Sequence, residues 1–266
     1  MSKFHLASQS IYLSVIGLLL GFIIGFFYAN HYNREAIMAG ASAVPGRPAS
    51  ATADSGQLPP DHPPIANEQE IQSAIRTAEG DPNNFEAQMA SMQTLYRAGR
   101  LDDAMRILQR AIKLKPEDYQ AIVQMGNLNY DVGDNSMQQG DKEGANTYFL
   151  EAARWYERAL KKNPQDINVR TDLGLTYYFR QPQDLDRAIA SYRQSLAVDP
   201  NHPQTLYNLT IALTEKGELS EAESALAKLT TIAPGAPILE RLRKGIEEKR
   251  SGTTASGPAP RPLSVK

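Results

Sequence analysis

The chain contains no cysteine among its 266 residues. It therefore has no disulfide, no thiolate nucleophile and no cysteine-based zinc site, and this absence fits either redox compartment. Its few histidines are dispersed along the sequence, so they do not converge on a metal ion or a serine; they are His5, His31, His62 and His202. The phosphate-binding pattern G-x-x-x-x-G-K-[ST] does not occur. We expect no catalytic residues, no cofactor and no metal, and hence no enzyme.

An excess of charge of either sign is also missing. The 28 Lys and Arg residues nearly balance the 30 Asp and Glu residues, which gives a formal net charge of -2. No long basic run appears along the chain. This balance argues against nucleic acid as a partner, because nucleic-acid binding needs a basic surface.

What the sequence does contain is a regular series of prolines. They stand 34, 48, 36 and 34 residues apart, at Pro82, Pro116, Pro164, Pro200 and Pro234. The residues before them repeat one order of apolar and small side chains. In one unit these are Leu95, Ala104, Leu108 and Ala111; in another they are Leu173, Gly174, Tyr177, Ala188, Tyr192 and Ser195. The period predicts an array of helical repeats.

A unit of two antiparallel helices, with small residues where they cross and a proline at its end, resembles the tetratricopeptide repeat (TPR) family. The resemblance implies an all-α solenoid of about four helix-turn-helix repeats. They lie within an array at 82–234, at 85–116, 119–164, 167–200 and 203–234. Repeats of this kind stack to bury their apolar faces and leave a concave binding surface. The implied function is binding of a protein partner.

Local signals support these units. Asp118 and Asp166 follow prolines by two residues and are expected to be helix N-caps. Gly99 and Gly217 fit the turns between paired helices. The second repeat carries 14 extra residues, which we interpret as a polar loop around 134–147 followed by a lengthened helix.

The array has expected flanking parts on both sides. A helix at 68–81 and a polar-backed helix at 235–250 would cover the open ends of the solenoid. Residues 251–266 are rich in Pro, Ser and Gly, and this composition predicts a disordered tail.

The N-terminal part predicts a membrane anchor. After a short leader at 1–10, the 19 residues at 11–29 carry no charge and would cross a hydrocarbon core of about 30 Å as a helix. A cleaved signal peptide is the alternative. Residues 30–67 mix Pro, Ala, Ser and Gly and are expected to form a disordered tether.

Three glycines recur every fourth residue in this span, at Gly17, Gly21 and Gly25. Such spacing lets a second helix approach closely, which predicts a homodimer through the membrane helix, although glycine is also common in membrane helices generally. The leader and Lys3 favour a cytoplasmic N-terminus. We therefore expect a single-pass protein of the bacterial inner membrane with a periplasmic array.

The resemblance also implies which residues line the groove, because fixed positions of each first helix face inward in the family. These are Met89, Gln93, Tyr96, Val123, Asn127, Tyr130, Thr171, Leu175, Tyr178, Tyr207 and Ile211. The surface they form is aromatic, amide-rich and nearly uncharged, which suits an extended or amphipathic peptide better than a charged tail. Tyr130 and Tyr178 could instead cover the core between repeats.

An anchor, a tether and a TPR array together resemble the membrane-anchored TPR subunits of bacterial envelope assembly, including those of cytochrome c maturation. That resemblance implies a scaffold that holds a client peptide or assembly partner. A translocon-associated periplasmic chaperone partner and a regulatory subunit of an envelope enzyme are the alternatives.

Overall fold

A computed structural model describes residues 67–252 and 260–265 of the chain. The leader, the membrane helix with Gly17, Gly21 and Gly25, and the tether up to residue 66 lie outside the described residues. No helix in the described part is both long and apolar enough to span a membrane.

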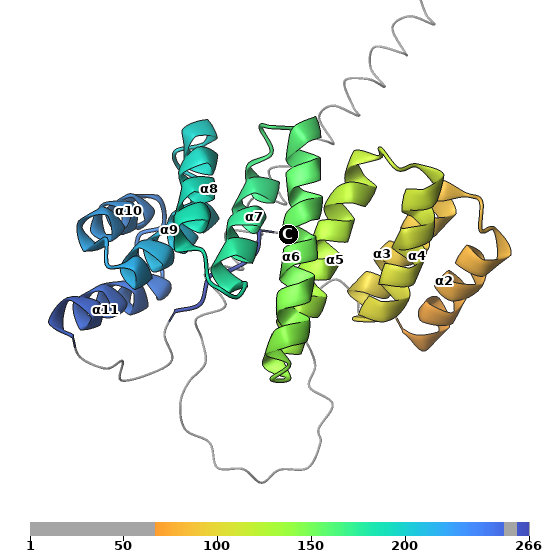
Figure 1. The fold of residues 1–266 in the computed structure, drawn as a ribbon, viewed down its shortest axis with the longest axis horizontal. Helices are drawn as coiled ribbons and strands as arrows, with labels where there is room; N and C mark the ends of the chain where they lie inside the picture. The colour runs from red at the N-terminus through yellow and green to blue at the C-terminus, as the bar shows by residue number, and fades with distance from the viewer. Residues whose placement is uncertain (1–66, 253–259, 266) are drawn as a thin grey trace, which may run out of the picture. The chain divides into compact units, whose positions relative to one another are not determined.

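The described residues form ten helices and no strand, and successive helices lie side by side along the array (Figure 1). Four antiparallel pairs make up the repeats, and one further helix stands before and after them. The bounds are α2 Glu68–Gly80; α3 Phe85–Arg97 with α4 Leu101–Leu114; α5 Tyr119–Gln138 with α6 Lys142–Lys162; α7 Ile167–Phe179 with α8 Leu185–Val198; α9 Pro203–Lys216 with α10 Leu219–Ile232; and α11 Ile238–Ser251. The array is thus an all-α solenoid, as the proline period predicts.

Each first helix of a pair begins three residues after a proline, and the residue just before the helix caps it. Asp118 Oδ1 accepts a hydrogen bond from the backbone N–H of Ala121 at 2.8 Å, and Asp166 Oδ1 accepts one from Val169 at 2.9 Å. Both predicted N-caps are therefore confirmed. Asn84 and His202 take the equivalent positions before α3 and α9. One local device, repeated four times, sets where the inner helices start.

Close helix crossings explain the glycines of the second and third repeats. A Cβ atom on Gly126 would lie 2.5 Å from Cε1 of Tyr156, and one on Gly174 would lie 2.4 Å from Cε1 of Tyr192. Both tyrosines are fully buried. Any side chain at these two crossings would displace an aromatic ring. Glycine therefore allows the paired helices to pack around that ring.

The extra residues of the second repeat are helical, and the polar loop expected around 134–147 is not observed. α5 and α6 are 20 and 21 residues long, and only three residues, 139–141, separate them. The added turns bury Gly133, Ala145 and Phe149, and the Phe149 ring lies over Gly133. Because the insertion extends an apolar stripe on both helices, continuing them buries more surface than a loop would.

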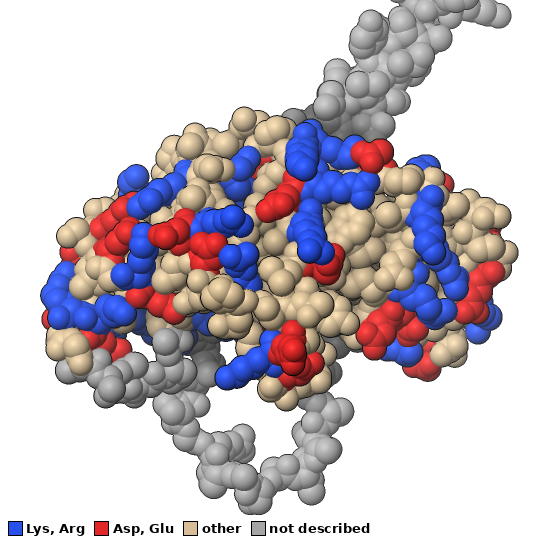
Figure 2. Space-filling model, viewed as in Figure 1, with Lys and Arg blue, Asp and Glu red and all other residues tan. Residues whose placement is uncertain are grey.

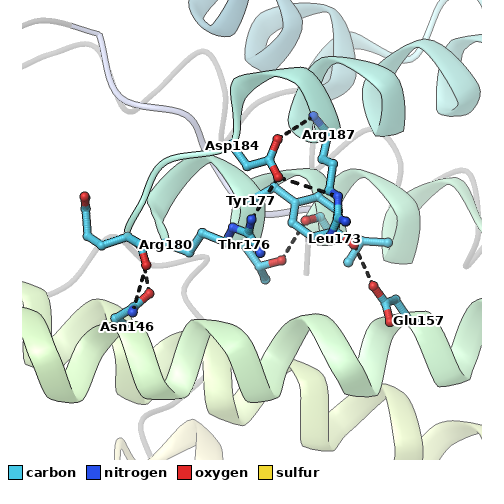
Figure 3. Close-up of polar contacts among 9 residues, drawn as sticks. Asn146, Glu157, Leu173, Thr176, Tyr177, Arg180, Asp184 and Arg187 are labelled. Carbon is cyan, nitrogen blue, oxygen red and sulfur yellow. Dashed lines mark hydrogen bonds and ion pairs between the residues drawn. The ribbon is translucent and has the colours of Figure 1, made fainter.

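The lengthened α6 supports the next repeat. Asn146 in its second turn exchanges two hydrogen bonds with the backbone of Gln181, at 2.7 and 3.0 Å (Figure 3). Further along α6, Glu157 accepts a hydrogen bond from the hydroxyl of Tyr177 at 2.6 Å. These contacts hold the turn at 180–184, between α7 and α8, against the preceding repeat.

Charged side chains complete that turn. Asp184 caps α8 by accepting from the backbone N–H of Arg187 at 3.0 Å, and its other oxygen lies 2.8 Å from Arg180 (Figure 3). Both guanidinium groups lie over the ring of Tyr177, at 5.5 and 5.6 Å from its centroid. Burial, followed by the hydrogen bond to Glu157, raises the pKa of Tyr177 to about 12. The hydroxyl therefore remains a donor at physiological pH.

The flanking helices extend the core at both ends of the repeats. In α2, Ile71, Ala74 and Ala78 join the core built by α3 and α4, and Gln88 donates to the carbonyl of Ala78 at 2.7 Å. In α11 the buried residues are Leu239, Leu242 and Ile246. Trp155 of α6 is partly buried against the same core as α2, with the Arg158 guanidinium 5.3 Å from its ring centroid.

Charges of both signs are interspersed over the face drawn in Figure 2. Many of them pair across neighbouring helices, as Arg193 does with Glu221 at 2.6 Å and Lys162 with Glu117 at 2.6 Å. Such pairs are screened by solvent because their side chains are exposed. They keep the outer surface polar while adding little to stability.

Candidate functional site: the inner face of α5, α7 and α9

A segment of the chain itself lies on the inner helices. Composition predicts disorder for 251–266, whereas the structure places residues 260–265 against α7 and α9 (Figure 1). Residues 253–259 and 266 lie outside the described part. We call 260–265 the tail segment. Its position has a physical cause, because side chains of the array supply partners for its backbone.

Most of these partners contact the backbone of the tail segment. Asn208 donates from Nδ2 to the carbonyl of Leu263 at 2.7 Å, and its Oδ1 accepts from the N–H of the same residue at 2.9 Å. Gln204 adds a second donor to that carbonyl at 2.8 Å. The Tyr207 hydroxyl donates to the carbonyl of Arg261 at 2.9 Å. One face of α9 therefore pairs with alternate residues of the tail segment.

α7 continues this pairing. Asp172 Oδ1 accepts from the backbone N–H of Val265 and from the hydroxyl of Ser264, both at 2.9 Å. Asp172 is only 3% exposed. Hydrogen bonds to an ionised carboxylate are stronger than those between neutral groups. One oxygen of Asp172 therefore recognises both a backbone N–H and a side chain of the tail segment.

Two further contacts involve the Arg261 side chain. Its guanidinium forms an ion pair with Asp134 near the end of α5 and lies 4.6 Å from the ring centroid of Phe179 at the end of α7. The Phe179 ring in turn stacks on Phe149 and meets Tyr130 edge-on, at centroid separations of 5.8 and 6.3 Å. An acidic group and an aromatic ring thus contact the basic side chain, which stays partly exposed.

The structure distributes the sequence-predicted groove residues among three environments. Tyr207 contacts the tail segment directly, and Tyr130 belongs to the aromatic cluster beside Arg261. Burial raises the pKa of Tyr207 to about 12, which keeps its hydroxyl a donor. Tyr178 donates to the carboxylate of Glu215 on the neighbouring helix. Ile211 is buried in α9.

A second group lies in the core rather than on an open groove. Thr171 is fully buried and its hydroxyl lies 2.6 Å from that of Thr205, across the contact between α7 and α9. Leu175 is also fully buried. Asn127 accepts a hydrogen bond from the Tyr156 hydroxyl at 3.0 Å. Thr171 thus joins the inner helices of two consecutive repeats, whereas Asn127 joins the two helices of one repeat.

The third group occupies the first repeat and the start of the second. Gln93 is exposed, while Met89, Tyr96 and Val123 are partly exposed. The Tyr96 hydroxyl donates to the carboxylate of Asp131, and burial together with that carboxylate raises the pKa of Tyr96. Within the described residues, the hydrogen-bonding partners of the tail segment lie on α5, α7 and α9, and none lies on α3.

Sequence reasoning missed the residues with the strongest contacts to the tail segment, namely Asp134, Asp172 and Asn208. Asp172 and Asn208 both stand at the sixth position of a first helix, in consecutive repeats. The recurrence of a hydrogen-bonding side chain at that position is the sequence signal that could have indicated these two residues. The expectation of a nearly uncharged groove also needs correction, because two carboxylates face the tail segment.

Within residues 67–252 and 260–265, no three His, Cys, Asp or Glu side chains are grouped as a metal site would require. The chemistry available at this surface is hydrogen bonding, one ion pair and apolar contact. Taken with the paired helices and their shared caps, this defines an α-solenoid whose inner helices hold a segment of the same chain.

Comparisons with known proteins identify the kind of repeat. Residues 85–128 and 179–244 match family models described as tetratricopeptide repeats. These two stretches therefore carry TPR repeats. This agrees with the resemblance drawn from the prolines.

Curated relatives are distant and much longer. The chain is 26% identical over 140 residues to protein O-mannosyl-transferase Tmtc3 of Drosophila melanogaster, an alignment covering 53% of this chain and 14% of that protein. It is 24% identical over 199 residues to cellulose synthase operon protein C of Pseudomonas fluorescens (strain SBW25), covering 74% of this chain and 15% of that one. The chain thus spans only a small part of the relatives it matches.

Solved structures show the same fold. A MamA fragment from Desulfovibrio magneticus RS-1 superposes with a TM-score of 0.53 at 17% identity, covering 62% of this chain and 84% of that one. A thermophilic TPR protein of Thermus thermophilus gives 0.51 at 21% identity, covering 66% and 89%. At these identities the likeness concerns the fold alone.

Proposed function

We propose that this scaffold holds a non-helical segment of a client protein along its inner helices. The observation that carries the proposal is the pairing of Asn208 with both backbone groups of Leu263. An amide that donates to a carbonyl and accepts from the N–H of one residue recognises peptide backbone whatever the side chain. The groove thus has the chemistry for segments of an unfolded chain.

The client is proposed to be a protein not yet folded, because a folded protein keeps most of its backbone groups paired internally. Asp172, Gln204 and Asn208 supply partners for such groups along the groove. The first repeat offers further surface, since Gln93 is exposed and Met89 is partly exposed.

The place of action is proposed from the N-terminal sequence. An uncharged run at 11–29 followed by a Pro-, Ala- and Ser-rich stretch at 30–67 would hold the array beside the bacterial inner membrane, on its periplasmic side. Attachment to the membrane would raise the local concentration of the array near clients emerging there. The client role we propose is delivery of unfolded apocytochrome in cytochrome c maturation. A translocon-associated chaperone partner would use the same groove, and so would a regulatory subunit.

Site-specific crosslinking tests this function. A photoreactive residue would replace Gln93 on α3 in the full-length protein, and in a matched control it would replace Gln109, an exposed residue of the outer helix α4. We expect haem-free apocytochrome c to crosslink from position 93 and much less from position 109. The folded holocytochrome should crosslink from neither. Equal yields from the two positions, or from the folded and unfolded forms, would contradict the proposal.

A further inference from the structure

We propose that the groove selects segments with the pattern Arg-Pro-x-Ser-Val and that the chain's own copy, residues 261–265, occupies it in cis, so that a client must displace it. This inference rests on the proposed function and names the class of segment the groove prefers. It starts from an observation that the backbone contacts alone do not explain, namely the unequal burial of the tail side chains.

Side chains of the tail segment differ in how far the array covers them. Pro262 is buried and Val265 is 8% exposed, whereas Leu263 between them is 43% exposed. The Arg261 side chain is also 43% exposed, but its guanidinium pairs with Asp134 and lies over the ring of Phe179. The array therefore contacts the side chains at 261, 262 and 265, whereas position 263 is held through its backbone.

The backbone contacts explain why proline suits position 262. The groups that bond to the array belong to residues 261, 263 and 265: the carbonyl of 261, both groups of 263 and the N–H of 265. None of these bonds uses the N–H of position 262. The proline there, which lacks an N–H, therefore removes none of these hydrogen bonds.

Proline also prepares the segment for binding. Pro260 and Pro262 each have a fixed φ, and a residue that precedes proline, as Arg261 does, avoids the helical region. A segment already restricted to non-helical conformations loses less entropy when it binds. The Pro-Arg-Pro sequence thus favours the bound form before any contact is made.

Position 264 adds a further preference. The Ser264 hydroxyl donates to the same Asp172 oxygen that accepts from Val265. A short side chain with a donor satisfies this carboxylate, and a long or acidic one would not. Together with the contacts of Arg261, this gives the groove two acidic groups that favour a basic and hydroxyl-bearing segment.

Covalent connection makes the cis copy an effective competitor. α11 ends at Ser251 and the tail segment begins at residue 260, so few residues join them. Short connections give effective concentrations on the order of millimolar. A client then meets a groove that is free for only part of the time. The client's apparent affinity is its intrinsic affinity multiplied by the fraction of time for which the groove is free.

Peptide binding to the full-length protein tests both parts of the inference. The probe is a fluorescein-labelled hexapeptide with the sequence of residues 260–265. The tail variant combines Arg261→Glu with Val265→Asp, which opposes Asp134 and places a charge at a buried position. We expect the probe to bind the tail variant about tenfold or more tightly than the unmodified protein, because the cis copy no longer competes.

Matched controls use the exposed position. The variant Leu263→Ala should bind the probe as weakly as the unmodified protein does, since its tail segment keeps every contact described above. A probe carrying alanine at position 263 should bind the tail variant like the original probe. A probe with Glu in place of Arg261 should lose about tenfold or more, which corresponds to about 1.4 kcal/mol.

Each contrary result has a definite meaning. Equal binding of the probe to the tail variant and the unmodified protein, or no binding to either, overturns cis occupancy. Equal binding of a scrambled hexapeptide overturns the sequence preference and leaves the proposed function standing. Failure of apocytochrome to crosslink from position 93, with the probe behaving as expected, overturns the proposed function alone.

Discussion

The two halves of the inner surface differ although their residues hold equivalent positions in the repeats. In the first half, Gln93 on α3 is exposed and Val123 on α5 is partly exposed. In the second half, Tyr207 on α9 is 4% exposed and bonds to the tail segment. The position of a residue within its repeat therefore indicates which way its side chain faces. The tail segment then determines whether that side chain is exposed or covered.

The difference has a chemical origin at the sixth position of each first helix. The first two repeats carry Ala90 and Gln124 there, and the next two carry Asp172 and Asn208. Only the latter two bond to the tail segment. The tail segment has a non-helical backbone that its prolines restrict, and its N–H groups bond to a carboxylate and an amide. Because these two side chains belong to the second half, the tail segment lies there.

The largest effect is expected from filling the helix crossing under the covered half. Gly174→Val would push a side chain into the ring of Tyr192, because even a Cβ would lie 2.4 Å from Cε1. We expect a loss of about 3 kcal/mol in the free energy of unfolding, since overpacking a close-packed core costs about 1–3 kcal/mol and sometimes more. Urea denaturation followed by circular dichroism measures it.

The matched control is Gly80→Val, at the end of α2, the helix that precedes the first repeat. A Cβ there meets nothing within 4 Å. We expect its unfolding free energy to change by less than about 0.5 kcal/mol. Equal losses for both variants would show that Gly174 is needed for backbone flexibility in general rather than for the approach of Tyr192.

A second prediction separates two residues that the sequence assigns to one surface. Asn127→Ala should destabilise the protein by about 1–3 kcal/mol, because it leaves the buried Tyr156 hydroxyl without the acceptor seen at 3.0 Å. Gln93→Ala, at an exposed position of α3, should change stability by less than about 0.5 kcal/mol. Thermal unfolding of the two variants checks this, and similar melting temperatures would contradict the division into core and open groove.

Much of the array could be predicted from the sequence, because its determinants are local. A proline followed two residues later by Asp118 or Asp166 fixes a helix start through contacts within one turn. Gly217 ends α9 with φ 89°, a conformation that favours glycine. Such signals act over a few residues, so they can be read without knowing the fold.

The parts that could not be predicted depend on distant partners. Disorder is the reasonable reading of a Pro- and Ser-rich tail taken alone, and only Asp172 and Asn208, far away in sequence, give it a bound form. The insertion near residues 134–147 looked polar by composition. Its helical form depends on the packing of Phe149 over Gly133. The periodicity of apolar residues indicated a longer helix only for α6, not for α5.

A smaller effect should come from the caps of the inner helices. Asp166→Ala removes the acceptor for the N–H of Val169 and the partner of the Tyr119 hydroxyl at 2.6 Å, so we expect a loss of about 1 kcal/mol or somewhat more. Asn84→Ala removes an exposed cap in the first half and should cost about 1 kcal/mol or less. Denaturation midpoints compare them. A larger loss at Asn84 would show that the first half depends more on its caps.

The smallest effect is a pH dependence confined to the second half, where His202 caps α9. Its Nδ1 accepts from the backbone N–H of Thr205 at 3.4 Å and lies 2.7 Å from the Thr205 hydroxyl. Burial lowers the pKa of His202, and the nearby Asp199 opposes this only in part. Only the neutral ring has a nitrogen that accepts, so protonation removes the cap.

The sign follows from the two pKa values. In the unfolded chain a histidine titrates near 6.5, and in the folded protein His202 titrates lower, so the unfolded state binds more protons between the two values. The stabilisation is therefore complete above about pH 6.5 and is lost as the pH falls through the folded pKa. The free energies of unfolding from urea denaturation at pH 7.5 and 5.5 should differ measurably, by up to about 1 kcal/mol, in the unmodified protein. The variant His202→Asn keeps a capping acceptor without the titration, so its stability should change less between the two pH values. An equal change in both proteins would assign the pH dependence to other groups and leave the α9 cap without a role in it.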